Sequence, residues 1–271
     1  MVHFVGAGSG APDLITVRGA RLLARADLVV YAGSLVNPAL LEGCRPGART
    51  LDSARMDLGQ VVSAMVAADA AGEEVVRLHT GDPSIYGAIR EQMDLLDEAG
   101  VAYDVCPGVS ALSGAAAALG AEYTLPGVSQ TVIVTRMEGR TPVPSGERLS
   151  KLASHGCTMV LFLSAGLLDR VQEELLRGAY GPDTPAAIVY KATWPDERVL
   201  RCTVGTLART AAEAGVSRMA IVAVGGFLEG PYLRSKLYDP AFETGFRPAR
   251  ATGGAGTGAA AEGGRADGGE A

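Results

Sequence analysis

The sequence predicts an α/β protein of two domains, and three observations support this. Short apolar runs alternate with helical patterns over roughly the first 120 residues, which is typical of a parallel sheet flanked by helices. Beyond residue 126, β-branched and apolar runs separated by loops rich in Pro and Gly predominate, which indicates a mixed sheet with fewer helices. The length of 271 residues suits one large domain or two of ordinary size.

The first domain is predicted to contain four buried strands, each a short apolar run. These runs are residues 2–5, 28–32, 75–79 and 103–106. Helical patterns begin at Thr16 and cover residues 57–71, about 87–99, and 111–119. In the first helix we expect Val17, Leu22 and Leu23 to face the core and the arginines to face solvent.

The second domain is predicted from five further β-branched or apolar runs. They are residues 131–135, 158–164, 186–190, 199–204 and 219–224. We place the first domain at residues 1–121 and the second at residues 122–248. Residues 249–271 are almost only Gly and Ala with a few charges, so they bury too little apolar area to offset their ordering entropy, and we expect a disordered tail.

Composition excludes several classes of function. The formal net charge of −6 argues against a nucleic-acid-binding protein. The four cysteines and three histidines are scattered without metal-ligand spacing, so no metal site is predicted. No basic leader precedes the first apolar run, and no segment has the length of a membrane span, so we expect a cytoplasmic protein.

The glycine-rich stretch at residues 6–11 satisfies the dinucleotide pattern GxGxxG/A after a strand. Two features disagree with that interpretation. Pro12 and Asp13 separate the loop from the helix, which begins near Thr16, and the nearby Asp27 precedes the second strand instead of following it. Three hypotheses remain for this stretch: a role at another ligand's cleft, a tight structural turn, and dinucleotide binding.

Three separated strings in the first half share one pattern. Residues 5–16 read VGAGSGAPDLIT, residues 80–87 read TGDPSIYG, and residues 107–110 read PGVS. They resemble, in order, the three motifs of the tetrapyrrole (corrin/porphyrin) methylases. The first motif usually reads GAGPGDPDLIT, so Ser9 and Ala11 depart from it.

Strings in the second half narrow the resemblance. Residues 125–126, 129–131, 135–136, 139–144, 189–197 and 234–239 are similar to the branch of that family that methylates C11 of precorrin-4. The resemblance covers residues 2–248. It implies a two-domain tetrapyrrole-methylase-like fold, each domain a mixed or parallel sheet with flanking helices, with the active-site cleft between the domains.

The resemblance also implies a function and a cofactor. The chain would be an S-adenosylmethionine-dependent C-methyltransferase of cobalamin biosynthesis, a homodimer that converts precorrin-4 to precorrin-5 and releases S-adenosylhomocysteine. Carried over by motif, the cofactor-binding positions are Pro12, Thr80, Gly81, Asp82, Ile85, Ser110, Ala111, Leu163 and Ala192. The glycine-rich start is implied to lie on the tetrapyrrole side of the cleft.

Substrate contacts are expected from the first motif and from the branch-specific strings. Corrin precursors carry acetate and propionate carboxylates, for which Arg and Lys are natural partners. The candidate substrate-binding residues are Gly8, Ser9, Gly10, Tyr86, Arg136, Arg140 and Lys191. Methyl transfer from a sulfonium needs alignment of the reactants and exclusion of water, and no catalytic residue is assigned.

Three alternatives remain open from the residues alone. Within the class, the substrate could be cobalt-precorrin-4, or the chain could be a sister methylase that acts at another carbon. An NAD-dependent oxidoreductase would use the glycine-rich loop instead. A non-catalytic tetrapyrrole carrier would bind the ring without transferring a methyl group.

Overall fold

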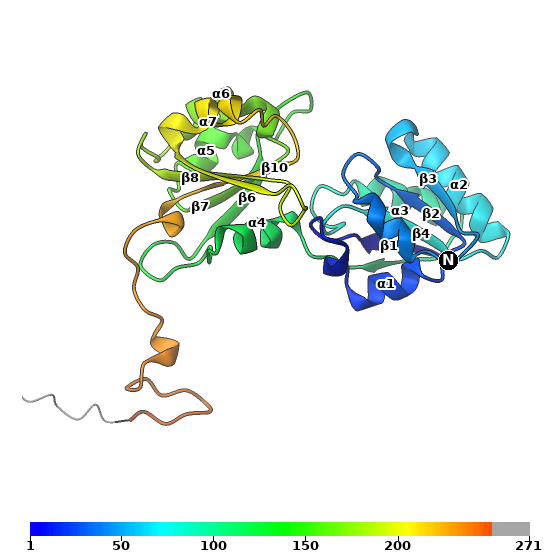
Figure 1. The fold of residues 1–271 in the computed structure, drawn as a ribbon, viewed down its shortest axis with the longest axis horizontal. Coiled ribbons are helices and arrows are strands. Elements are labelled where there is room, and N and C mark those ends of the chain that lie inside the picture. The colour runs from blue at the N-terminus through cyan, green and yellow to red at the C-terminus, as the bar shows by residue number, and fades with distance from the viewer. Residues whose placement is uncertain (251–271) are drawn as a thin grey trace, which may run out of the picture. The chain divides into compact units, whose positions relative to one another are not determined.

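The computed structural model describes residues 1–250. Residues Met1–Tyr232 form one compact unit that contains two five-stranded sheets (Figure 1). Residues 233–250 belong to a second unit. The α/β class and the presence of two sheets are therefore as predicted.

The first sheet is entirely parallel, with strand order β3-β2-β4-β1-β5. Its strands are β1 (Val2–Gly6), β2 (Leu28–Tyr31), β3 (Arg49–Asp52), β4 (Val75–His79) and β5 (Tyr103–Cys106). Four of them confirm predicted runs. The sequence pattern missed β3 because it is a polar edge strand, and its first two residues are exposed.

Helices cover both faces of the first sheet. They are α1 (Val17–Leu23) on one face, and α2 (Leu58–Ala70) and α3 (Ile89–Glu98) on the other. Thr16 caps α1 by accepting a hydrogen bond from the backbone N–H of Gly19 at 3.1 Å. Asp57 and Gln60 form a reciprocal capping box that starts α2. These polar caps fix the helix starts that the sequence predicted.

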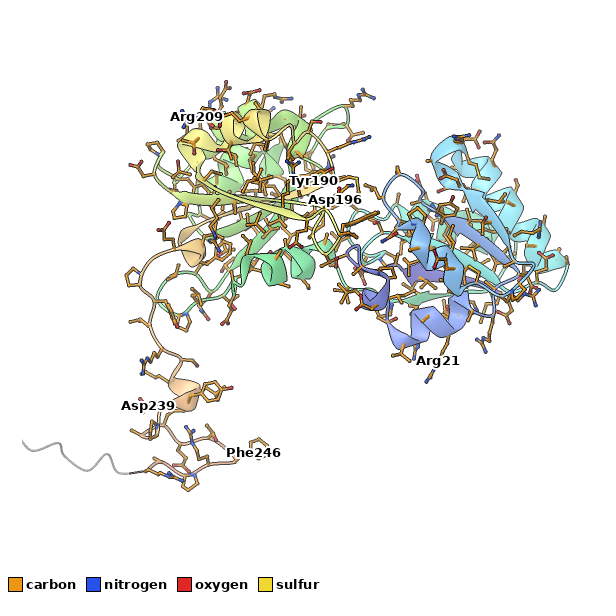
Figure 2. The ribbon with its side chains drawn as sticks, viewed as in Figure 1. Arg21, Tyr190, Asp196, Arg209, Asp239 and Phe246 are labelled. Atoms are coloured by element: carbon orange, nitrogen blue, oxygen red, sulfur yellow. The ribbon has the colours of Figure 1, made fainter. Side chains whose placement is uncertain are left out.

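One orientation predicted for α1 is wrong. Leu22 and Leu23 are buried as expected, but Val17 is 68% exposed. The buried face also includes Gly19. Val17 lies two residues from Gly19, about 200° around the helix, so it points away from the sheet. The arginines of α1 face solvent, as Arg21 does in Figure 2.

The second sheet is mixed, with strand order β6-β7-β10-β8-β9. Its strands are β6 (Val132–Arg136), β7 (Thr158–Phe162), β8 (Pro185–Tyr190), β9 (Arg198–Thr203) and β10 (Ala220–Val224). Only β6 and β7 pair in parallel, and the other neighbours are antiparallel. All five correspond to predicted runs within a few residues.

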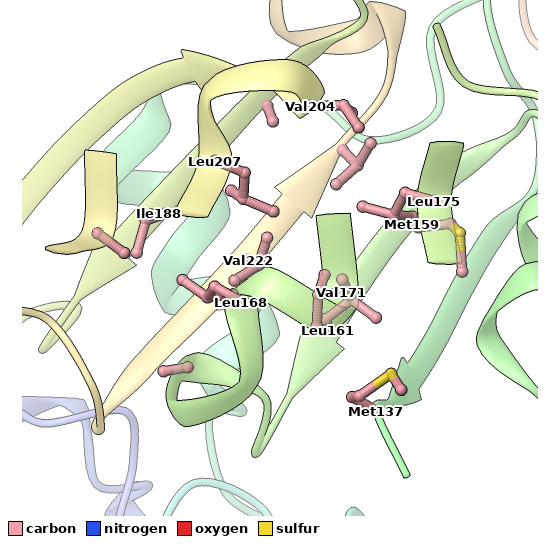
Figure 3. Packing of buried hydrophobic residues seen from close by; sticks show 14 of the residues in the cluster. Met137, Met159, Leu161, Leu168, Val171, Leu175, Ile188, Val204, Leu207 and Val222 are labelled. Atoms are coloured by element: carbon pink, nitrogen blue, oxygen red, sulfur yellow. The ribbon is translucent and has the colours of Figure 1, made fainter. Parts of the chain in front are cut away.

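Helices α5 (Leu149–Ala153), α6 (Leu168–Leu176) and α7 (Leu207–Glu213) cover one face of the second sheet. In Figure 3, Val171 and Leu175 of α6 point toward the strands that carry Met159, Leu161 and Val222. These three helices were not located from the sequence. Helices α5 and α7 are short, with five and seven residues, whereas α6 has Leu168, Val171 and Leu175 at helical spacing, a signal that was overlooked.

Helix α4 (Ala111–Leu119) covers the opposite face of the second sheet (Figure 1). Its Ala115 and Leu119 pack with Val160, Ala187 and Val189 from that sheet. The predicted boundary between residues 121 and 122 assigns α4 to the first domain. The packing favours an earlier boundary, between β5 and α4, and we propose that placement.

Residues 233–250 are described separately from the two sheets. The guanidinium group of Arg247 donates to the backbone carbonyls of Leu237, Asp239 and Phe242, which ties this segment together. The disorder predicted for residues 249–271 concerns almost entirely residues 251–271, which lie outside the described residues. Among the residues described, no helix combines the length and apolarity that crossing a membrane requires.

Candidate functional site

A cavity of about 420 Å³ lies where the loops of the two sheets meet. From the first sheet it is lined by residues that follow β1, β2, β4 and β5, at the carboxyl ends of the parallel strands. From the second sheet come the end of β7, the end of β8 and the start of β10. Carboxyl ends of parallel strands are the usual position of ligand sites in open α/β sheets.

Three glycines bring the three sequence motifs together beside this cavity. A Cβ atom at Gly108 would lie 2.2 Å from the carbonyl oxygen of Gly81 and 2.7 Å from the Cα of Gly6. A Cβ at Gly6 would be equally crowded by Gly108. At Gly6 and Gly108 the backbones approach so closely that only glycine fits, and Gly81 has a φ of 60°, so backbone geometry accounts for all three glycines without any ligand.

The glycine-rich start forms a structural junction. Gly8 and Gly81 exchange backbone hydrogen bonds of 2.9 and 3.3 Å. The hydroxyl of Thr193, beyond β8, accepts from the backbone N–H of Ala11 at 3.0 Å and lies 3.1 Å from the hydroxyl of Ser9. A Cβ at Gly10 would overlap the indole ring of Trp194.

This geometry disfavours dinucleotide binding by the loop. Three residues of 3₁₀ helix, Pro12–Leu14, follow it, and α1 begins only at Val17. The loop therefore does not lead directly into a helix N-terminus that could seat a pyrophosphate. Asp27, the acidic residue nearest to the second strand, has structural partners instead: it forms an ion pair with Arg45 and accepts a hydrogen bond from the backbone N–H of Glu74.

Asp82 joins the second motif to the third. Its carboxylate accepts hydrogen bonds from the backbone N–H of Gly108 at 2.8 Å, from the backbone N–H of Ser84 at 2.9 Å, and from the Ser84 hydroxyl. Burial opposes ionisation of Asp82, but the hydrogen bonds outweigh it and lower the pKa of this carboxyl. The ionised side chain lines the cavity and holds the loop at residues 107–110 against the second motif.

The cavity wall contains an unusual concentration of left-handed backbone. Tyr86, Leu163, Lys191 and Met219 all have positive φ angles, between 49° and 56°, and all four line the cavity. Non-glycine residues rarely adopt this conformation, which costs free energy and concentrates at binding sites. The positive φ angles therefore support the hypothesis that the cavity is a binding site, independently of the residue types that line it.

Lys191 and Trp194 form a cationic, aromatic part of the lining. The Lys191 ammonium lies 2.6 Å from a carboxylate oxygen of Asp196, and 5.5 and 5.4 Å from the ring centroids of Tyr190 and Trp194. The hydrogen bond that Lys191 donates to Asp196 raises the pKa of Lys191, which keeps it charged. Figure 2 shows Tyr190 and Asp196 near the junction of the two sheets.

Tyr86 also lines the cavity, with its ring centroid 5.6 Å from that of Phe162. Burial raises the pKa of its phenol, and the nearby charge of Arg136 partly offsets this effect. The Arg136 guanidinium donates to the backbone carbonyls of Met137, Thr141 and Pro142, so it braces the loop after β6.

The structure brings most of the candidate residues together. The predicted cofactor positions that line the cavity are Thr80, Gly81, Asp82, Ile85, Ser110, Ala111, Leu163 and Ala192, and the predicted substrate positions that line it are Ser9, Tyr86 and Lys191. Pro12, Gly8, Gly10, Arg136 and Arg140 are not part of the lining. Which of these residues touch a ligand stays a prediction.

Sequence reasoning missed the part of the wall formed by residues 217–221 at the start of β10. Arg218 lies there with an exposed side chain, and among residues 1–250 no carboxylate pairs with it. Ser34 and Leu35, which follow β2, were also missed. The available signal was their position beside predicted strand ends. Within the described chain, no group of three or more His, Cys, Asp and Glu side chains could hold a metal ion.

Comparison with known proteins agrees with this architecture. The family model for Tetrapyrrole (Corrin/Porphyrin) Methylases matches residues 1–208, which span the three motifs and most of the second sheet. The chain belongs to this family. The match covers more than half of its length and includes nearly every cavity-lining segment.

Two curated relatives of this tetrapyrrole methylase are similar over most of their length. A cobalt-precorrin-4 C(11)-methyltransferase of Methanocaldococcus jannaschii is 48% identical over 247 residues, which cover 91% of this chain and 95% of the relative. A precorrin-4 C(11)-methyltransferase of Rhodococcus erythropolis is 50% identical over 228 residues, which cover 84% of this chain and 91% of the relative.

Two solved structures share the fold. The X-ray structure of a cobalt precorrin-4 methyltransferase matches with a TM-score of 0.83 and 48% identity, over 84% of this chain and 96% of that chain. A uroporphyrin-III C-methyltransferase from Thermus thermophilus, complexed with S-adenyl homocysteine, matches with a TM-score of 0.71 and 27% identity, over 84% and 98% of the two chains.

Proposed function

We propose that this chain is an S-adenosylmethionine-dependent methyltransferase that methylates C11 of precorrin-4 or of its cobalt form. The observation that carries the proposal is the single cavity on which the three family motifs and β8 converge, in a chain about half identical to relatives named for that reaction. The out-of-class alternative, an NAD-dependent oxidoreductase, has no support from the geometry of the glycine-rich loop.

The cavity fits a nucleoside-sized group. A volume of about 420 Å³ lies within the usual range of about 300–1,000 Å³ for small-ligand sites. Much of the lining is apolar, as at Leu35, Ile85 and Leu163, with Thr80 and Ser110 as polar groups. We infer that these residues and the backbone at residues 81–82, 111 and 192 hold S-adenosylmethionine.

The protein's part in the reaction is positioning. S-adenosylmethionine, when bound, supplies the methyl group and carries its own leaving group. The left-handed turns at Tyr86 and Leu163 hold the cavity walls in fixed positions, and a fixed geometry lowers the entropic barrier to an in-line displacement. The apolar side chains exclude water from the reacting atoms.

Cations near the cavity provide partners for the carboxylates of a tetrapyrrole. Lys191 lines the cavity, but its ammonium group already forms an ion pair with Asp196. Arg218 is exposed beside the cavity, so it can bind a carboxylate without first breaking an ion pair. Arg136 and Arg140 stay predictions, since neither belongs to the lining.

Three finer points are part of the proposal. One of the two curated relatives is named for a substrate with cobalt and the other for a substrate without it, and both are similarly identical to this chain, so similarity alone favours neither form of the substrate. A homodimer and a cytoplasmic location stay predictions.

Calorimetry with S-adenosylhomocysteine and with NAD tests the cofactor assignment. We expect binding of S-adenosylhomocysteine and none of NAD. Asp82→Ala should weaken S-adenosylhomocysteine binding by about tenfold, because the loop at residues 107–110 loses its brace. Binding of NAD without binding of the sulfur nucleoside would overturn the proposal.

A further inference from the structure

A buried polar pair lies between β4 of the first sheet and helix α3, and neither residue lines the cavity. Arg77 on β4 is 6% exposed and Gln92 on α3 is 5% exposed. The Nε of Arg77 donates to the Gln92 side-chain carbonyl at 2.9 Å, and its Nη1 donates to the backbone carbonyls of Val30 and Leu78. Within residues 1–250 no carboxylate pairs with this guanidinium.

The Gln92 side chain, held by Arg77, also forms a hydrogen bond with a backbone carbonyl. Its Nε2 donates to the carbonyl oxygen of Ala88 at 2.9 Å. Ala88 has a φ of 50° and Tyr86 a φ of 56°, so both ends of the turn at residues 86–88 are left-handed. Gly87 between them packs directly against the carbonyl of Pro83. The same loop carries Ile85 and Tyr86 into the cavity wall.

Replacing this pair by apolar side chains should cost the helix–sheet contact little stability. Burying a guanidinium without a carboxylate costs free energy, and apolar replacements of buried polar pairs are often neutral or stabilising. Hydrogen bonds return part of that cost and also fix geometry. The geometry fixed here is that of the strained turn at residues 86–88, because Gln92 holds its last carbonyl in place.

We propose that Gln92, held in place by Arg77, is a positioning residue that fixes the turn at residues 86–88 and so keeps Ile85 and Tyr86 in the wall of the cofactor cavity. This inference rests on the proposed function. It assigns no contact with the ligand to either residue. It predicts that ligand affinity and fold stability respond differently when the pair is changed.

Two variants separate affinity from stability. Gln92→Glu keeps the acceptor for Arg77 and adds an opposite charge, but it removes the donor to Ala88. Arg77→Met combined with Gln92→Met replaces the pair by apolar side chains and removes both hydrogen bonds of the Gln92 side chain. Leu96→Ala is the matched control, since Leu96 is fully buried on the same helix and lies outside the hydrogen-bond chain.

The readouts are the melting temperature and the Kd for S-adenosylhomocysteine, followed through the fluorescence of Trp194. This residue is the single tryptophan of the chain and lines the cavity. Gln92→Glu and the double variant should melt at or near the wild-type temperature yet bind about tenfold more weakly, the equivalent of one hydrogen bond. Leu96→Ala should melt earlier and keep its Kd within about twofold.

The outcomes distinguish the two proposals. Wild-type binding together with an unchanged Kd in both pair variants would overturn the positioning role alone. A Kd that rises equally in Leu96→Ala would also overturn it, because the effect would then follow stability. Failure of the wild-type chain to bind S-adenosylhomocysteine would overturn the proposed function, and this inference with it.

Discussion

At the scale of single residues, His79 shows how burial changes an ionisable group. It ends β4, directly before the second motif, with 4% of its surface exposed. Its Nε2 has no hydrogen-bond partner among the described residues. Burial, reinforced by the nearby charge of Arg77, lowers the pKa of His79 to about 3. The folded protein therefore holds this ring neutral.

The low pKa of His79 predicts a loss of stability in mild acid. Because the unfolded chain takes up a proton near pH 6.5 and the folded chain only near pH 3, stability falls as the pH drops through this range. Between pH 7 and pH 5 this amounts to about 2 kcal/mol. His79→Leu should remove that part of the pH dependence in urea unfolding, while His155→Gln, at an exposed position, should keep it. An equal slope in wild type and His79→Leu would contradict the assignment.

At the scale of elements, the three motif segments depend on backbone contact. Gly6, Gly81 and Gly108 belong to three different strand–loop junctions, yet each pair is too close for a Cβ atom. The cavity therefore rests on a layer of backbone atoms. Asp82 strengthens this layer by linking the second and third segments.

This packing predicts that Gly108→Ala is strongly destabilising. Its methyl group would lie 2.2 Å from the Gly81 carbonyl, so the loops must separate, at a cost of about 2–3 kcal/mol. Gly146→Ala is the control, since nothing lies within 4 Å of that position. Thermal unfolding should show a marked fall for Gly108→Ala and little change for Gly146→Ala. Equal melting temperatures for the two variants would mean that the segments do not pack as described.

The limits of prediction at this scale have physical causes. Buried strands were predictable because a central strand covered on both faces is a short, nearly continuous apolar run, as β2 and β10 are. Edge strand β3 was missed because half of it faces water. Helices α5 and α7 were missed because five and seven residues carry little periodic signal, whereas α6, with Leu168, Val171 and Leu175 at helical spacing, could have been predicted.

The site was predictable only where it coincides with a motif. Residues 80–87 and 107–110 carry a local signature, and members of both line the cavity. Arg218 and Met219 join the cavity through the antiparallel pairing of β10 with β8. Such pairing between distant segments leaves no local pattern in the sequence. The Arg77–Gln92 pair was not predicted either, because its two residues lie on different elements and meet only in the folded chain.

At the scale of the whole molecule, two sheets of different topology contribute to one cavity. The parallel sheet supplies the loops at its carboxyl edge, and the mixed sheet supplies strained positions after β7 and β8 and before β10. The glycine-rich start connects the two through Thr193 and Trp194. Its pattern resembles a dinucleotide loop, while its contacts are those of a structural joint beside the cavity.

The activity assigned to the two-sheet cavity is transfer of a methyl group from S-adenosylmethionine to C11 of precorrin-4, with or without cobalt. The most direct test is to incubate the purified chain with each form of precorrin-4 and S-adenosylmethionine carrying a ¹³C-labelled methyl group. Mass spectrometry and NMR should show one added methyl, with the label attached at C11, in at least one of the two products. Label attached to another carbon, or no transfer to either form, would contradict the account.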